Sequence, residues 1–346
     1  MFVRNRTRYK ASLTHGNVSD AMAIATIVVE AALRVGDRGA LTLDREREPA
    51  PTDPPDTSRH ALWNEVSVTV SGTVYGPARA PFITPVSLRV GDELRRVVVF
   101  GDRRWERSLG GALEASDPEP FESIPLGFNL AFGGKYQVPP GPHPLTGLPH
   151  PGGEAAYPQN PDGRGFYGDA ESAEGSPLPN IELPDQLLKQ WDDRAEPAGF
   201  SPCPTLIALR FSEDFIWRAT GLRPGSPPPE SPILLAGYAP VAMLRAIHHA
   251  PGRLIFPSIA PGTPIEVTGV GRRPLRFAIP DVPAEVVTAS GDKPTSRTGP
   301  PLRHELRSVH IDADGGHVLL AYGYTTTYRR DFAPEWLRVL PPRAPG

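Results

Sequence analysis

The chain has 346 residues, with 36 basic side chains, 39 acidic side chains and a formal net charge of −3. This near balance lacks the basic surface that binds nucleic acid or an anionic membrane, so we expect neither partner. The 44 prolines and 34 glycines indicate many loops, while a hydrophobic content of 39% indicates a globular protein. The single cysteine excludes an intrachain disulfide.

The first third of the chain predicts β-strands. Apolar and polar residues alternate from Val66 to Val70 and again from Val86 to Val90, which is the pattern of half-buried strands. A turn at Gly91-Asp92 leads into Leu94–Phe100 and predicts a hairpin whose second strand is more fully buried. Upstream, Thr26–Val35 is another predicted strand.

The last third repeats this pattern. The clearest unit is a predicted hairpin in which Val309–Asp312 meets Val318–Tyr322 across Asp314-Gly315-Gly316, because glycine supplies the positive φ of a tight turn. Four further short strands are predicted at Leu206–Phe211, Leu254–Ile259, Ile265–Val270 and Leu275–Ile279.

Helical patterns are scarce, and only Asp185–Trp191 and Ala239–His249 are predicted as short helices. Short strands separated by turn residues favour a mainly-β fold: a β-sandwich-like scaffold of short antiparallel strands, a long irregular middle segment rich in proline and glycine, and few short helices. We divide the chain into a β-rich part at 1–117, the middle segment at 118–204 and a second β-rich part at 205–346. The sequence leaves open whether these parts form one domain.

The middle segment is the most informative part of the sequence. Between Phe121 and Asn180, prolines fix φ and glycines permit positive φ, so a specified irregular backbone is predicted. Aromatic residues recur throughout this segment, whereas disordered linkers are poor in them. A long, ordered and irregular segment typically carries function.

Catalytic and metal-binding patterns are weak, and we predict no catalytic residue, no metal and no cofactor. The adjacent His248 and His249 would point about 100° apart on a helix and cannot chelate one ion together. Asp162-Gly163-Arg164-Gly165 lacks the preceding strand and following helix of a phosphate loop. His310 and the nearby aspartates fit a hairpin turn.

The segment Gly101–Trp105 directly follows a predicted buried strand and has two interpretations. Trp105 either anchors the core behind a turn at the strand end, or forms with arginine an exposed anchor for a protein partner.

Six short blocks, taken in this order and spacing, resemble one bacterial family, domain of unknown function 2169, found beside type VI secretion genes. The blocks are Val97–Trp105, Pro120–Leu126, Ala131–Gly134, Asn160–Phe166, Leu178–Glu182 and Pro197–Phe200. The resemblance spans nearly the whole chain, although Asp214–Gly221 departs from the Gly-Thr-Tyr-Asp block of many relatives. It implies a chaperone or adaptor that holds a secreted effector and helps load it onto the trimeric spike or its tip protein.

We therefore expect a non-enzymatic adaptor whose middle segment recognises an effector or spike protein. Two alternatives stay open: a hydrolase or carbohydrate-active enzyme on a loop-rich β-scaffold, and a structural component of a secretion assembly. The residues expected to bind the partner or to support the binding loops are Asp102, Arg103, Trp105, Phe132, Gly133, Gly134, Tyr136, Asn160, Pro161, Gly163, Arg164, Gly165, Phe166, Pro179 and Asn180.

The N-terminal region superficially resembles a signal peptide, because basic residues precede the apolar run Ala21–Leu33. Asp20 and Glu30 interrupt the apolar character of this region, so we expect no signal peptide and a cytoplasmic location.

Overall fold

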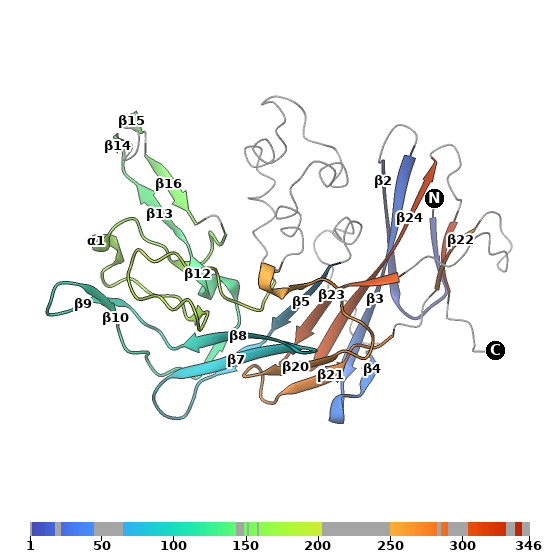
Figure 1. The fold of residues 1–346 in the computed structure, drawn as a ribbon, viewed down its shortest axis with the longest axis horizontal. Coiled ribbons are helices and arrows are strands. Elements are labelled where there is room, and N and C mark those ends of the chain that lie inside the picture. Colours follow the sequence, from blue (N-terminus) through green and yellow to red (C-terminus); the bar gives the residue numbers. More distant parts are fainter. Residues whose placement is uncertain are drawn as a thin grey trace.

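The structure is a computed structural model that describes residues 2–17, 22–44, 65–142, 149–150, 152–157, 159–202, 250–281, 285–289, 304–329 and 336–340 (Figure 1). Strands dominate these residues. The prediction of a mainly-β fold is therefore confirmed.

The largest sheet has seven strands and joins the first and last thirds of the chain. In spatial order its strands are β19 (Ile255–Phe256), β5 (Val66–Ser71), β23 (His304–Asp312), β24 (His317–Arg329), β3 (Met22–Val35) and β2 (Lys10–Asn17), with β4 (Leu41–Leu43) beside β3. The predicted hairpin of the last third is confirmed as β23–β24, and Gly316 in its turn has a φ of 67°.

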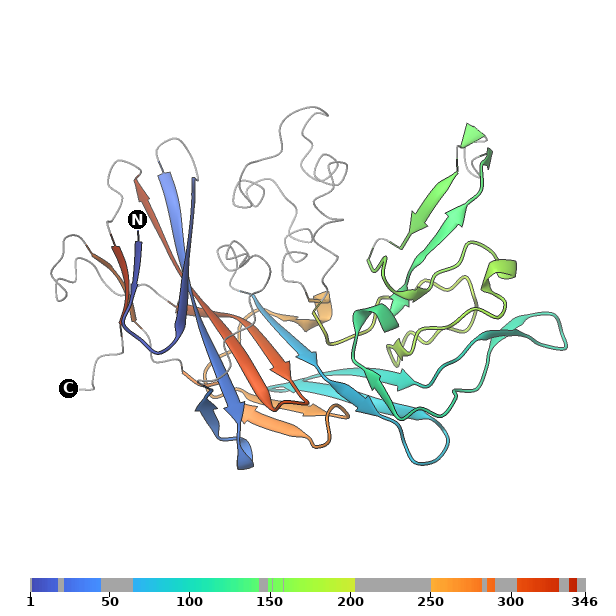
Figure 2. The ribbon, with the colours of Figure 1, turned by 180° about the vertical axis from the view of Figure 1, so that it is seen from behind.

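A second sheet of five strands lies across one end of the long strands (Figures 1 and 2). Its order is β18 (Ile181–Glu182), β8 (Glu93–Phe100), β7 (Ile83–Val90), β20 (Pro264–Thr268) and β21 (Leu275–Ala278). The β7–β8 hairpin across Gly91-Asp92 is also confirmed. Apolar side chains from both sheets form one continuous core, which therefore unites the two β-rich parts.

The scaffold differs from the predicted short antiparallel strands in two respects. β3 has 14 residues and β24 has 13, so the central pair is long, and β5 runs parallel to β23. β5 was predicted to be half-buried, yet Ser67 and Thr69 on its polar face are buried as well. The Thr69 hydroxyl can be accommodated there because it lies 3.0 Å from the His310 imidazole.

Smaller sheets complete the fold. Three strands, β1 (Phe2–Asn5), β25 (Trp336–Leu340) and β22 (Glu285–Ala289), form one sheet, in which β1 and β25 are parallel. The two-stranded pairs are β6 (Thr73–Tyr75) with β11 (Ser123–Pro125), β9 (Trp105–Arg107) with β10 (Leu113–Ala115), β12 (Phe132–Gly133) with β17 (Arg164–Gly165), β13 (Lys135–Val138) with β16 (Gly153–Ala156), and β14 (Gly141–Pro142) with β15 (Pro149–His150).

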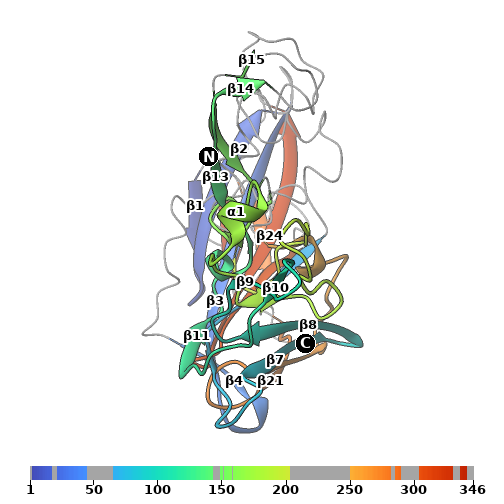
Figure 3. The ribbon, with the colours of Figure 1, turned by 90° about the vertical axis from the view of Figure 1, so that its left-hand side faces the viewer.

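The described residues between 101 and 200 form what we call the loop module, which has its own apolar cluster. The cluster is built around Trp105, Phe132 and Leu178, all at most 1% exposed. Figure 3 faces the loop module and shows α1 (Ala170–Ala173) and the β9–β10 hairpin in front of the long strands. The described 3-10 helices are η1 (Asp37–Gly39), η3 (Phe128–Leu130) and η5 (Gly252–Leu254).

The predicted helix at Asp185–Trp191 is wrong, because side chains take up its backbone donors. The Glu182 carboxylate accepts the Leu188 N–H, and the Asp193 carboxylate accepts the N–H groups of residues 189 and 190. Leu254–Ile259 is a strand only at Ile255–Phe256.

Some predictions lie outside the described residues. They are the strand at Leu206–Phe211, the helix at Ala239–His249 with its histidine pair, and the altered block Asp214–Gly221. No helix in the described ranges has the length and apolar character needed to cross a lipid bilayer.

Candidate functional site

The loop module contains a close contact between Gly133 and Asn160. Gly133 has a φ of 151°, and a Cβ at this position would lie 2.0 Å from the Asn160 carbonyl oxygen. The Asn160 side-chain amide donates to the backbone carbonyls of Phe128 (2.8 Å) and Phe132 (3.1 Å). The backbone carbonyl of Asn160 accepts from Gly134 N–H (2.9 Å). Because Asn160 is only 2% exposed, these bonds fix the path of both segments.

The block from Asn160 to Phe166 packs against the segment that contains Gly133. Gly163 packs so tightly that a Cβ would lie 2.4 Å from the Asn160 amide nitrogen, and Gly165 has a φ of 101° beside Pro179. Only glycine meets both requirements without displacing the backbone. The β12–β17 pair is parallel and joins the two predicted glycine blocks directly.

Aromatic side chains cover this contact. The Tyr157 ring lies 4.9 Å from the Phe132 ring and 5.3 Å from the Phe166 ring, measured between centroids. Tyr136 packs on Phe166 at 5.2 Å, and the Arg194 guanidinium lies 4.8 Å from the centre of the Phe166 ring. Phe132 is buried and the other three rings are partly exposed, so this cluster belongs partly to the core and partly to the surface.

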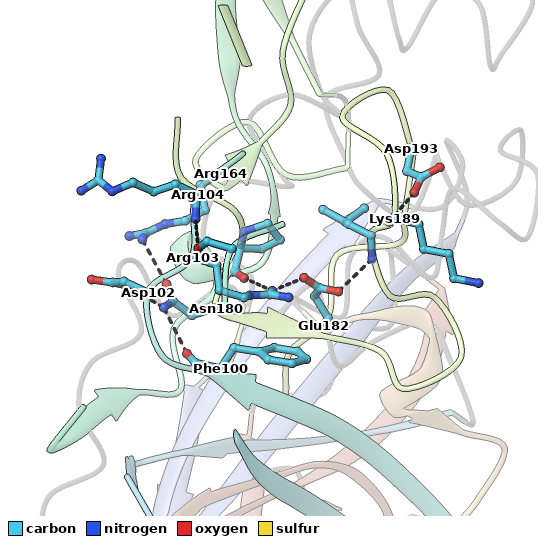
Figure 4. Close-up of polar contacts among 12 residues, drawn as sticks. Phe100, Asp102, Arg103, Arg104, Arg164, Asn180, Glu182, Lys189 and Asp193 are labelled. Carbon is cyan, nitrogen blue, oxygen red and sulfur yellow. Dashed lines mark hydrogen bonds and ion pairs between the residues drawn. The ribbon is translucent and has the colours of Figure 1, made fainter. Parts of the chain in front are cut away.

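A segment at residues 178–183, which we call the strap, ties the loop module to the five-stranded sheet. Its centre is Asn180, whose backbone N–H donates to Leu130 O and whose carbonyl accepts from Phe100 N–H. The Asn180 side-chain amide donates to Phe100 O at 3.2 Å and to the Asp102 carboxylate at 2.9 Å (Figure 4). Arg164 completes the set by donating to Asn180 Oδ1 at 3.0 Å.

A buried ion pair lies next to Asn180. Arg103 is 7% exposed and Glu182 is 2% exposed, and the guanidinium donates both to Glu182 Oε1 and to Pro179 O (2.8 Å) (Figure 4). The same guanidinium lies 3.7 Å from the centre of the Phe100 ring. The second carboxylate oxygen, Glu182 Oε2, accepts the Leu188 N–H at 2.9 Å. The pair therefore connects the strand end, the strap and the following turn.

Burial has the largest effect on the pKa of Glu182. Desolvation raises the pKa of Glu182 above its ordinary range, while the charge of Arg103 and the Leu188 N–H act in the opposite direction. The nearby Asp193 adds a small upward contribution to the same pKa.

The structure brings the predicted site residues together in the loop module, some in its interior and some partly exposed. Trp105 is completely buried, and within the described part of the chain its indole N–H has no hydrogen-bond partner. Its placement matches the core-anchoring interpretation, in which it supports the module from inside. Asn160, Pro161, Pro179 and Asn180 are buried as well, whereas Tyr136, Arg164 and Phe166 are partly exposed and Asp102 is exposed.

Two features of the loop module escaped sequence reasoning. Glu182 is the partner of Arg103, and a lone acidic residue between Ile181 and Leu183 was the available signal for it. Leu109 was also missed: it lies at the tip of the β9–β10 hairpin and is fully exposed. The glycine-rich turn around it signals a hairpin but does not reveal how far the leucine projects.

The described residues contain no group of three or more histidine, cysteine or acidic side chains placed to hold a metal ion. Among the described residues, one arrangement with a catalytic appearance lies outside the loop module. Ser71 Oγ lies 3.2 Å from His310 Nε2, and Thr69 Oγ1 lies 3.0 Å from His310 Nδ1. A hydroxyl therefore occupies the place where a catalytic triad has a carboxylate.

Fold and site together define a mainly-β protein with a rigid loop module fastened to its scaffold by buried polar contacts. The chain matches, over residues 20–322, the family described as an uncharacterized protein conserved in bacteria, domain of unknown function 2169, and it belongs to that family. No curated protein and no solved structure shows significant similarity to the chain.

Proposed function

We propose that this protein is a cytoplasmic, non-enzymatic adaptor that binds a type VI secretion effector and helps load it onto the spike complex. The observation that carries the proposal is the dense set of internal contacts in the loop module. Its irregular backbone is held by the Asn160 and Asn180 contacts and by the buried Arg103–Glu182 pair. A binding face that is already ordered loses little conformational entropy when a partner docks.

The module also offers residues suited to a protein partner. Arg164, Tyr136 and Phe166 are partly exposed, and Leu109 projects from a separate hairpin. Arginine and aromatic side chains are enriched at binding hot spots. The buried Trp105 and Phe132 support these residues from beneath.

The test is binding between the purified, tagged protein and the purified products of its neighbouring genes, in particular the effector, the trimeric spike and its tip protein. We expect at least one of them to be retained in a stable complex. Gly163→Ala should weaken the complex, because its Cβ would collide with the Asn160 side chain. Gly252→Ala is the matched control, since a Cβ there meets nothing within 4 Å. Folded wild-type protein that retains none of the three products would refute the adaptor.

A hydrolase is the second candidate, and the Ser71–His310 distance of 3.2 Å is the observation that favours it. The test is labelling with a fluorophosphonate probe, which reacts with activated serines. Labelling that disappears in Ser71→Ala would establish an activated nucleophile and favour the enzyme. The adaptor predicts no labelling above that of the heat-unfolded chain.

A structural component of the secretion assembly would differ from an adaptor mainly in stoichiometry. Purified, assembled particles would retain a structural component in fixed ratio, whereas an adaptor would leave after loading.

A further inference from the structure

The β13–β16 ribbon stands out from the rest of the fold because it projects from the loop module away from both large sheets (Figures 1 and 2). Each of its two strands has four residues and, among the described strands, pairs only with the other. An isolated two-stranded ribbon is at best marginally stable in water and gains stability from a third strand.

The pattern of hydrogen bonds shows which backbone groups face outward. Tyr157 N–H donates to Gly134 O, so these two residues stand at a hydrogen-bonded pair position at the base of the ribbon, although Gly134 N–H donates to Asn160 O instead. Such pairs alternate along antiparallel strands, which places Tyr136 opposite Ala155 in the next one. The N–H and C=O groups of the intervening residues therefore point away from the ribbon: residues 135 and 137 on the β13 edge, and residues 154 and 156 on the β16 edge. No backbone hydrogen bond from another described residue reaches either edge.

The ribbon is held firmly at its base, so its edges are positioned before any partner arrives. The Tyr136 ring packs on Phe166 and fits against Gly168, where a Cβ would lie 2.7 Å from the ring. At the same end, Gly134 N–H donates to Asn160 O. The ribbon thus extends directly from the most constrained part of the loop module.

Two other strand edges in the described structure are covered. The outer edge of β21 faces η1, and a Cβ on Gly39 would lie 2.6 Å from the Arg276 carbonyl oxygen. The outer edge of β9 is occupied by residues 174–176, with Trp105 N–H donating to Ser176 O and Gly175 N–H donating to Trp105 O. Proteins commonly cover such edges to prevent unwanted pairing.

We propose that the β13–β16 ribbon accepts an extended segment of the effector or spike protein as an added strand, an inference that rests on the proposed function. Each edge spans roughly 13 Å, which suits a short extended segment. Lys135 and Glu154 neutralise each other across the ribbon at 3.1 Å, so an uncharged segment meets no unpaired charge there. Main-chain hydrogen bonds would supply the affinity, as in other cases of strand addition.

The test uses the same purified neighbouring-gene products and measures Kd for variants of each edge. Gln137→Pro and Ala156→Pro each remove one outward N–H while leaving the internal bonds of the ribbon in place. We expect the proline on the receiving edge to weaken binding at least tenfold. Gln137→Ala keeps the N–H and should stay within twofold of wild type. Unchanged melting temperatures would show that the variants are folded.

Hydrogen exchange on the wild-type complex provides a second measurement that needs no variant. On binding, the amides of residues 135 and 137, or those of residues 154 and 156, should become protected, while those of Tyr136 and Val138 change little. Binding that survives both prolines without this alternating protection overturns the added strand and leaves the adaptor intact. A wild-type chain that binds none of the products overturns both proposals. Dimers that either proline dissociates would show that the edge receives a second copy of this chain, which also overturns the proposal.

Discussion

The buried Arg103–Glu182 pair permits a sharp prediction about stability. Arg103→Met preserves much of the volume but leaves the Glu182 carboxylate buried with the Leu188 N–H as its remaining described partner. Removing one member of a buried ion pair typically costs about 3–5 kcal/mol, because the other charge stays desolvated. We therefore expect Arg103→Met to lower the free energy of unfolding by about this amount in urea titrations followed by circular dichroism.

The double variant Arg103→Met/Glu182→Leu is the matched control. It removes both charges, and buried pairs replaced together by apolar side chains are often neutral or stabilising. The Arg103 Nε, which is buried without a described partner, is lost as well. The double variant should thus be more stable than the single variant. A single variant that loses less than about 1 kcal/mol would match a surface pair and refute the reasoning.

The pH dependence of stability tests the same pair. Because burial raises the pKa of Glu182, the folded state binds this proton more tightly than the unfolded state. The contribution of Glu182 to stability is therefore fully present below the unfolded-state pKa and is lost as pH rises through the folded-state pKa. Relative to Glu182→Gln, wild-type stability should fall as pH increases from about 4.5 toward neutrality. If wild-type stability instead rose over this range relative to Glu182→Gln, the charge of Arg103 would lower the pKa of Glu182 by more than desolvation raises it.

The remaining predictions concern the loop module. Gly133→Ala should destabilise the protein more than Gly111→Ala, because both positions have positive φ but only Gly133 would collide with the backbone; urea titration of both variants measures the difference. Trp105→Ala should cost about 3–5 kcal/mol, whereas Trp105→Phe should cost less because it deletes an indole N–H without a described partner. Leu109→Ser should leave stability within about 0.5 kcal/mol of wild type and weaken retention of the neighbouring-gene product in the co-purification assay, and unchanged retention would exclude the hairpin tip from the interface.

Sequence patterns predicted the scaffold well where periodicity and turn chemistry agree. The β7–β8 and β23–β24 hairpins followed from alternation joined to glycine turns. The parallel pairing of β5 with β23 did not, because it joins segments about 240 residues apart and leaves no local signal. The Asp185–Trp191 helix failed for a related reason: the Glu182 and Asp193 carboxylates that take its backbone donors are brought into position by the fold.

The candidate site, like the scaffold, could be predicted only in part from the sequence. Glycine and proline spacing identified the rigid segment, and several blocks that carry the family resemblance meet around Asn160 and Asn180. The sequence could not distinguish a buried aromatic residue from an exposed one, so Trp105 had two interpretations until its burial was known.

Within the loop module, the residues that fix the backbone differ from those that are available to bind a partner. The residues that fix its backbone, such as Asn160, Asn180 and Arg103, are buried and cannot touch a partner without unfolding the module. Recognition must then come from the partly exposed side chains and the ribbon edges that this frame positions. Exchanging exposed side chains such as Leu109 between family members should therefore alter the choice of client with little change in unfolding free energy. Exchanging the buried residues should mainly change the free energy of unfolding. If exchanging the buried residues alone transferred the choice of client, this separation of roles would be wrong.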